Sequence, residues 1–203
     1  MPEGNPWPPG TRLGVKDYQD DYEKRFNTTR GHASWKLERR QSFREPGYPS
    51  WEAFVRGDWP EALRLIETER EELDELSKEA DERDIELFRV RVVEEPFSPY
   101  LHWELYLLKV RAECGEKIRV VTRDQVERFE AEKPLPEVLT VGSDTVYRIL
   151  YREDGVLEGA VRIVAPGAVE NYTRVIEQLY DNGEQIERFF QREVAPLEPP
   201  RPE

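Results

Sequence analysis

Two alternating runs of apolar residues on either side of an Asp-Gly pair constrain this fold more than any other feature. The runs are DTVYRILYRE (residues 144–153) and VLEGAVRIV (residues 156–164), and Asp154–Gly155 lies between them. An Asp-Gly pair between alternating runs is a strong signal for a β-hairpin, because both residues tolerate the left-handed backbone that a tight turn needs. We therefore expect a sheet that contains at least one antiparallel pair.

Three further segments have the pattern of strands. KIRVV (117–121) and EVLTV (137–141) are short apolar runs. In DIELFRVRVV (84–93) alternate side chains should point to opposite faces of a sheet, one set being Phe88, Val90 and Val92 and the other Leu87, Arg89, Arg91 and Val93. With the hairpin, these segments give about five strands.

Helical patterns fill the intervals between the strands. Ser98 and Pro99 are suited to begin a helix and Gly115 to end it. We expect helices over residues 15–26, 51–55, 60–83, 99–114, 123–130, 168–183 and 184–194. The late strands follow one another without long crossovers. The predicted fold class is therefore α+β, with an antiparallel or mixed sheet of about five strands covered by helices, rather than a doubly wound sheet.

Composition divides the chain into three parts. Residues 1–47 form a charged, proline-containing arm that could include helices, residues 48–195 a single α+β domain, and residues 196–203 a proline-rich tail. The formal net charge is −13, and the acidic excess lies beyond residue 50. Such a body repels phosphates, so nucleic acid is not the expected partner. No secretory signal pattern opens the chain and no apolar stretch approaches ~20 residues, so we expect a cytoplasmic protein without a membrane span.

Most signatures of enzyme chemistry are missing from the sequence. The chain has no phosphate-binding loop of the P-loop or dinucleotide type and no nucleophile elbow. One cysteine and two histidines cannot make a Cys/His zinc site. Cys114 follows an acidic stretch at a helix end, which disfavours its thiolate. We therefore predict no catalytic residue, no metal site and no cofactor.

One helix carries a candidate ligand pocket. At ~100° per residue, Glu104 and Arg111 fall on the same side of a helix over residues 99–114. This helix has apolar residues on two flanks, so it should be mostly buried, with Glu104 near arginines of the sheet. Carboxylates, arginines and tyrosines together can line a pocket; the alternative is an ion-pair network that ties helix to sheet. The candidate residues are Arg89, Arg91, Tyr100, Glu104, Arg111, Tyr147 and Arg148.

A second candidate site lies in the arm, where basic and aromatic residues interleave. The contact candidates for nucleic acid or a protein partner are Trp35, Lys36, Arg39, Arg40 and Arg44. The alternative is an amphipathic helix that buries Trp35 and Phe43 and extends its arginine side chains along the surface.

The stretch FRVRVVEEPFSPYLHWELY, followed by GEKIRVV, DTVYRILYREDGVLEGAVRI and a closing helical segment, resembles an uncharacterised actinobacterial family of domains of unknown function. Members of that family are often encoded beside helix-turn-helix regulators. The resemblance covers Pro49 to Phe190, and the charged arm departs from it. The matching positions are Arg89, Arg91, Tyr100, Glu104, Tyr147 and Gly155. The resemblance implies no activity and, at most, a regulatory or accessory role.

Three functions are compatible with these features. The leading hypothesis is a non-enzymatic binding or regulatory accessory protein that acts through protein contacts, with a partner such as a transcriptional regulator. The alternative is a small-molecule-binding domain or enzyme with a pocket near Glu104. A weaker alternative is nucleic-acid contact through residues 35–44, which requires an affinity that falls steeply with salt. The sequence does not predict the oligomeric state.

Overall fold

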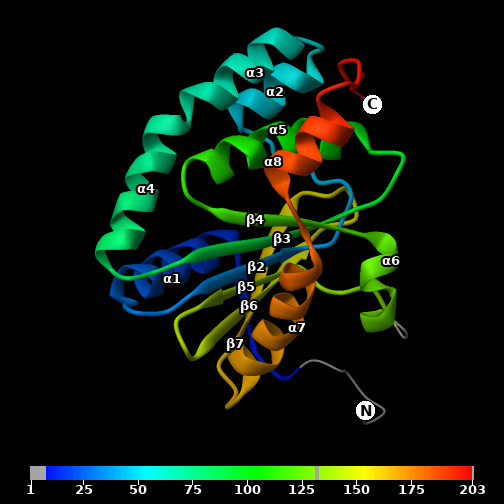
Figure 1. Cartoon of the computed structure of the whole chain (residues 1–203). Coiled ribbons are helices and arrows are strands. Elements are labelled where there is room, and N and C mark those ends of the chain that lie inside the picture. Colours follow the sequence, from blue (N-terminus) through cyan, green and yellow to red (C-terminus); the bar gives the residue numbers. More distant parts are fainter. Residues whose placement is uncertain (1–7, 131–132, 203) are drawn as a thin grey trace.

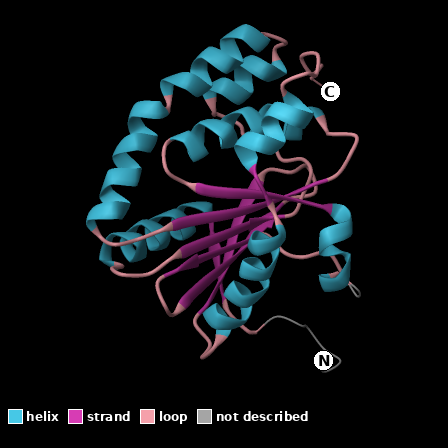
Figure 2. Ribbon diagram, in the orientation of Figure 1, coloured by secondary structure: helices cyan, strands magenta, loops and turns pink. Residues whose placement is uncertain are grey.

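A mixed sheet with helices on both faces forms the body of the protein (Figures 1 and 2). The structure is a computed structural model that describes residues 8–130 and 133–202. Within these residues the sheet has eight strands in the order β1-β7-β6-β5-β2-β3-β4-β8. Their bounds are β1 Thr11–Gly14, β2 Ser34–Glu38, β3 Leu87–Val93, β4 Lys117–Thr122, β5 Val138–Val141, β6 Thr145–Tyr151, β7 Leu157–Ile163 and β8 Glu184–Gln185.

The helices lie largely where the sequence places them. Ser98 Oγ accepts a hydrogen bond from the Leu101 N–H at 3.0 Å, and Gly115 follows the helix with a φ of 108°. The prediction of a single helix over residues 60–83 is wrong, because one helix ends and the next begins at Glu69. The Glu69 carboxylate accepts a hydrogen bond from the Tyr48 hydroxyl. The bounds are α1 Val15–Thr28, α2 Pro49–Val55, α3 Trp59–Thr68, α4 Arg70–Glu82, α5 Pro99–Glu113, α6 Arg123–Val126, α7 Ala168–Asn182 and α8 Ile186–Phe189, with short helical turns at Glu127–Phe129 and Phe190–Val194.

The prediction of an antiparallel or mixed sheet is confirmed, because the sheet is mixed. The prediction of about five strands is wrong, because the described residues form eight. Strands β2, β3 and β4 are parallel neighbours, and the other pairs are antiparallel. The chain crosses from β2 to β3 through α2, α3 and α4, and from β3 to β4 through α5. The unpredicted strands are β1, β2 and β8, of which β1 and β8 have four and two residues. Strands this short leave no alternation to recognise.

Strand β2 replaces the helix that was the alternative interpretation of residues 35–43. It lies inside the sheet, hydrogen-bonded to β3 on one side and β5 on the other. Part of the segment before residue 48 is therefore built into the same sheet as the rest of the chain. The first seven residues of the predicted arm, and the last residue of the predicted tail, lie outside the described residues.

The expected hairpin is confirmed. Strands β6 and β7 pair antiparallel, with Arg148 opposite Val161. Their loop covers residues 152–156, longer than a two-residue turn. Gly155 has a φ of 84° within it, and its N–H donates to the Arg152 carbonyl at 3.0 Å. The glycine is needed because side-chain-bearing residues rarely adopt this backbone conformation.

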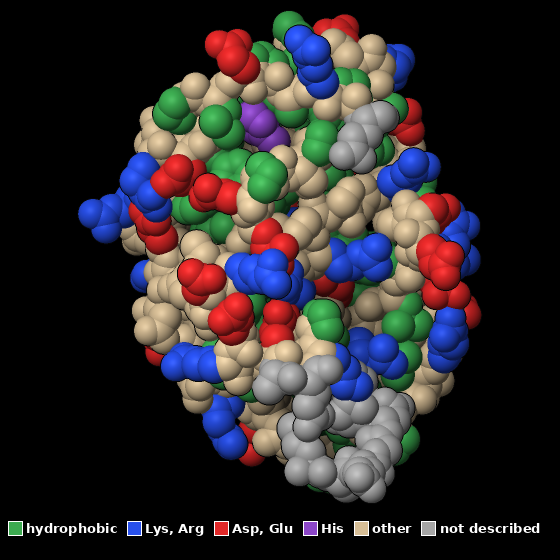
Figure 3. Space-filling model, turned by 90° about the vertical axis from the view of Figure 1, so that its right-hand side faces the viewer, with side chains coloured by type: hydrophobic (Ala, Val, Ile, Leu, Met, Phe, Trp, Pro, Cys, Tyr) green, Lys and Arg blue, Asp and Glu red, His purple; other side chains and the backbone are tan. Residues whose placement is uncertain are grey.

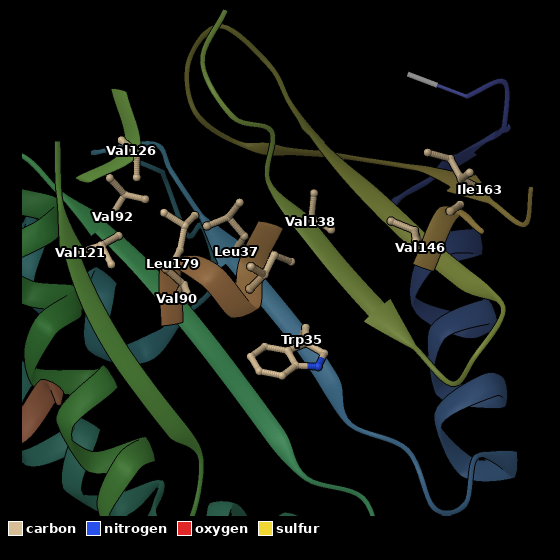
Figure 4. Close-up of a cluster of buried hydrophobic side chains, with 12 residues drawn as sticks. Trp35, Leu37, Val90, Val92, Val121, Val126, Val138, Val146, Ile163 and Leu179 are labelled. Atoms are coloured by element: carbon tan, nitrogen blue, oxygen red, sulfur yellow. The ribbon is translucent and has the colours of Figure 1, made fainter. Parts of the chain in front are cut away.

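The two faces of the sheet differ in chemistry. The face under α6 and α7 is mainly apolar, and Figure 4 shows its cluster of buried side chains around Trp35, Val90 and Leu179. The opposite face packs against α1, α4, α5 and α8. On that face the central strands present charged side chains, so the apolar clusters there are separated by a polar region. This polar region under α5 is where the candidate site lies.

Candidate functional site

Strands β2 and β3 present four charged side chains toward α5. In the parallel register Lys36 is opposite Arg89 and Glu38 is opposite Arg91. The intervening residues, Trp35, Leu37 and Val90 among them, point to the apolar face. The predicted alternation of β3 is confirmed, because Val90 and Val92 lie in the cluster under α7 while Arg91 reaches α5. The sequence thus places a row of charges on the inner side of a sheet.

Arg91 and Glu104 form the innermost ion pair. The Arg91 Nε donates to Glu104 Oε2 at 2.7 Å, and the Arg91 side chain is fully buried. Its Nη1 donates to the Val92 carbonyl at 2.9 Å, while Nη2 has no partner among the described residues. Burial raises the pKa of Glu104, and the Arg91 charge offsets part of that rise. The guanidinium keeps its proton, because the nearby carboxylates raise the pKa of Arg91 despite its burial.

Arg89 joins two further carboxylates. It donates to Glu38 at 2.8 Å and to Glu116 at 2.6 Å, and Glu38 also pairs with Lys36 at 2.7 Å. Burial alone would raise the pKa of Glu38, but Arg89 and Lys36 outweigh burial and hold that pKa well below its usual range. Burial would likewise raise the pKa of Glu116, but the charges of Arg89 and Arg111 outweigh burial and lower it. These two carboxylates are therefore ionised at neutral pH.

A cavity of about 170 Å³ lies among these charges, between α5 and the central strands. Three acidic and three basic residues line it, so the lining itself is close to neutral. Aromatic and leucine side chains complete its walls. The lining residues are Lys36, Glu38, Glu45, Tyr48, Arg89, Tyr100, Trp103, Glu104, Leu107, Leu108 and Arg111. We call this cavity the α5 pocket.

Five of the seven predicted pocket residues meet here. Arg89, Tyr100, Glu104 and Arg111 line the α5 pocket, and Arg91 lies directly behind Glu104. The Tyr100 hydroxyl is 3.3 Å from one carboxylate oxygen of Glu104 and 3.3 Å from one of Glu45. Arg111 is held loosely, with its Nη1 3.4 Å from Glu116. The helix phase that grouped Glu104 with Arg111 is therefore correct in geometry.

The other two predicted pocket residues lie elsewhere. Tyr147 is under α1, where its hydroxyl donates to Asp21 at 2.5 Å. Arg148, the next residue of β6, points to the opposite face, where its charge acts on Tyr172 of α7. Adjacent residues of a strand point to opposite faces, so the two could not share one pocket.

The basic and aromatic residues of the arm do not form one strip. Trp35 is 8% exposed and stacks on Phe88 on the apolar face, while Lys36 lines the α5 pocket on the other side of the sheet. Arg39 pairs with Glu94 at 2.7 Å and with Glu130 at 2.6 Å. Arg40 lies 5.5 Å from the centre of the Tyr151 ring. Arg44 is exposed beside the β6–β7 loop, where its N–H donates to the Gly155 carbonyl.

Several pocket residues were missed from the sequence: Glu38, Glu45, Tyr48, Trp103, Leu107 and Leu108. One usable signal was present. Alternation in SWKLE places Lys36 and Glu38 on the same side of a strand, opposite Trp35 and Leu37, and this pattern was interpreted as a contact strip instead. Glu45 and Tyr48 lie in a loop before α2, where no periodicity indicates which way a side chain points.

The rest of the described chain has further surface hollows but no metal site. A groove of about 480 Å³ shares Tyr100 with the α5 pocket and is also lined by Phe43, Trp51 and Pro202 of the tail. Across residues 8–130 and 133–202, no three His, Cys, Asp or Glu residues are grouped to hold a metal ion. None of the helices in these ranges has the length and apolar character to cross a membrane.

A family model described as "Domain of unknown function (DUF6879)" matches residues 20–191. The chain belongs to this family. The match begins in α1 and includes β2, so it reaches further toward the N-terminus than the resemblance from Pro49 to Phe190. No curated protein matches the chain significantly.

Among solved structures, a similar chain is TrmBL2, an archaeal chromatin protein described with a novel mode of DNA binding. It is 11% identical, with a TM-score of 0.41, and the match covers 86% of this chain and 52% of that one. The chain thus spans about half the length of TrmBL2. A likeness at this level carries no argument about fold or function.

Proposed function

We propose that this protein is a small-molecule-binding domain whose ligand occupies the α5 pocket. The observation that supports the proposal is the cavity itself. Protein interiors are close-packed, so a network that served only to tie α5 to the sheet would leave little space among its charges. Here charged and aromatic side chains instead surround about 170 Å³ of space. Pockets with a few converging polar groups and perturbed pKa values are typical of binding sites.

We propose binding without catalysis, in an accessory role. The pocket-lining cations Lys36, Arg89 and Arg111 are paired with carboxylates, so in this proposal they organise the pocket and do not take part in a reaction. In this proposal the domain is a cytoplasmic regulatory accessory, and ligand occupancy affects its contact with a protein partner such as a transcriptional regulator. The support for that partner is the resemblance to a family often encoded beside such regulators.

Nucleic-acid contact through residues 35–44 is not favoured by the geometry. A contact strip needs its basic and aromatic side chains on one accessible surface, whereas Trp35 is buried and Arg39 is held by two carboxylates. On the face shown in Figure 3, basic and acidic side chains are interspersed. Such a surface gives no extended positive field for a phosphate backbone.

The experiment is an NMR screen of small polar fragments against the whole chain. The Trp103 indole is a built-in reporter, because it lines the α5 pocket and its Nε1–H donates to Ser50 Oγ at 2.8 Å. We expect at least one class of fragment to shift this resonance saturably. Arg111→Gln should change the affinity for any charged fragment that binds, because it removes a charge from the pocket lining. Lys109→Gln, on the same helix but outside the pocket, should leave it unchanged. Failure of every fragment class to perturb the pocket would reject the proposed function.

A further inference from the structure

The carboxylates of the α5 pocket differ in their ion-pair partners. Glu38 is paired with Lys36 and Arg89, and Glu104 with Arg91. Glu45 has no ion-pair partner among the described residues, and its side-chain hydrogen bond is the long contact of 3.3 Å from the Tyr100 hydroxyl. Lys36 acts on Glu45 only from a distance, because its ammonium group is bound to Glu38 at 2.7 Å. One half-buried carboxylate in this pocket therefore lacks a cation.

Aromatic side chains surround the same part of the pocket. Tyr48, Tyr100 and Trp103 all line it. Their rings contact one another edge-on or tilted, with centroids 5.8 Å apart for Tyr48 and Trp103 and 5.4 Å apart for Tyr100 and Trp103. An ammonium group is attracted to the negative faces of aromatic rings and to carboxylates. Aromatic rings beside an unpaired carboxylate therefore form a site that is suited to bind a cation.

The pocket is less suited to an anion. Lys36 and Arg89 are fully engaged in ion pairs, and Arg111 is shared with Glu116. The Arg91 Nη2 has no hydrogen-bond partner in the described part of the chain, but it lies behind Glu104 and does not line the pocket. An anionic ligand that displaced the carboxylate partner of Lys36 or Arg89 would leave that carboxylate unpaired in a buried environment. Of these three cations, only Arg111, whose contact with Glu116 is 3.4 Å long, could meet an anion without such a loss.

We infer that the ligand of the α5 pocket is a small primary amine whose ammonium group is held by Glu45 against Tyr48 and Tyr100. This inference rests on the proposed function, since it names the ligand class of the same pocket. The cavity of about 170 Å³ has room for about six water molecules at about 30 Å³ each. The bound part of the ligand is therefore short, about the size of a butyl chain with its amino group. Burial raises the pKa of Glu45, and a bound cation would offset that effect.

The test compares probes that differ only in the polar group. The whole chain is titrated with n-butylamine, n-butanol and sodium butyrate at constant pH and ionic strength, and with inorganic phosphate as a second anion. The Trp103 indole resonance is followed by NMR. We expect saturable shifts with butylamine, and binding at least about tenfold weaker with butanol and with either anion. This comparison needs no variant, so it holds even where a pocket substitution disturbs the fold.

A matched pair of variants locates the amine. Glu45→Gln keeps the side-chain shape but removes the charge, and should weaken butylamine binding about tenfold, the effect of losing a charge-assisted hydrogen bond. Glu72→Gln on the exposed side of α4 should change nothing. Binding of butyrate or phosphate in preference to butylamine would overturn the amine inference and leave the proposed function standing. No shift with any of these probes would also overturn it, and the wider fragment screen would then decide the proposed function separately.

Discussion

The Arg91 guanidinium lies 2.7 Å from the Glu104 carboxylate, and the Arg91 side chain has no exposed surface. The pair joins the middle of the sheet to the middle of α5. Two charges in such a place are tolerated because each neutralises the other and each has further hydrogen bonds, from Tyr100 to Glu104 and from Arg91 to the Val92 carbonyl. Removal of either partner should therefore have a much larger effect than removal of a surface pair.

We expect Glu104→Gln to lower the free energy of unfolding by about 3 kcal/mol, because the buried Arg91 charge then has no counter-ion. Urea unfolding followed by circular dichroism measures the change. Glu113→Gln is the matched control on the same helix. Its ion pairs with Lys109 and Arg70 are part-exposed, so its effect should stay below about 1 kcal/mol.

A double variant separates loss of the pair from loss of the site. Arg91→Met combined with Glu104→Gln removes both charges, so we expect it to be more stable than Glu104→Gln alone. Strictly additive losses in the two single variants would contradict a coupled ion pair.

Gly159 is required by the close approach of β1 to β7. Its φ is 136°, and a Cβ added to it would lie 2.1 Å from the Leu13 carbonyl oxygen. We expect Gly159→Ala to destabilise the protein by at least about 2 kcal/mol, because backbone atoms cannot move away as a flexible side chain can. Gly14 is the matched control: it pairs with Gly159, has a φ of −70°, and would have open space around an added Cβ. Gly14→Ala should cost less than about 1 kcal/mol. Equal thermal stability of the two variants would argue against this close approach.

The local part of the fold could be predicted from sequence, and the long-range part could not. Alternation gave β3 and the β6–β7 hairpin, and Ser98 and Gly115 gave the ends of α5, because these signals depend on neighbouring residues. Strand β2 was missed because Lys36 and Glu38 do not look like buried strand residues. They are tolerated there only because Arg89, far away in the chain, lies next to them in the sheet.

The same limit applies to the candidate site. Helix phase was enough to group Glu104 with Arg111, and the inward side of β3 was enough to add Arg89 and Arg91. Arg148 was placed on the wrong face because it was considered separately from Tyr147, although alternation allows only one of them to face α5. The loop that carries Glu45 and Tyr48 has no periodicity, so its contribution to the pocket became visible only in three dimensions.

The Cys114 thiol should react slowly with disulfide reagents in the folded protein. It is 8% exposed, and burial, with a contribution from Asp74, raises the pKa of its thiol. Because the thiolate is the reactive form, we expect a disulfide reagent such as Ellman's reagent at neutral pH to modify the native chain more than about tenfold more slowly than the chain unfolded in urea. Equal rates in the two states would show that Cys114 is accessible and ionised. This outcome would also reopen the thiol as a candidate nucleophile.

Glu137 should make the protein less stable as the pH rises toward neutrality. Its carboxylate accepts the backbone N–H groups of Arg39 and Arg40, at 3.0 Å and 2.7 Å. Burial, and then the charge of Glu38, raises its pKa from 4.5 to about 7. The folded state therefore binds this proton more tightly than the unfolded state. The resulting stabilisation is complete below pH 4.5 and is lost as the pH rises through about 7.

The raised pKa of Glu137 sets the size of this effect. The free energy of unfolding that it contributes below pH 4.5 and loses above about pH 7 is about 3 kcal/mol. Glu137→Gln isolates it, because an amide oxygen can accept the same backbone hydrogen bonds but cannot ionise. Urea unfolding at several pH values from 5 to 8 should show Glu137→Gln gaining stability relative to the unsubstituted chain as the pH rises. A constant difference across this range would mean that Glu137 does not titrate there. Carboxyl-carbon NMR of the native protein checks the midpoint directly, since the pKa of Glu137 is raised to about 7 and its signal should titrate near that pH.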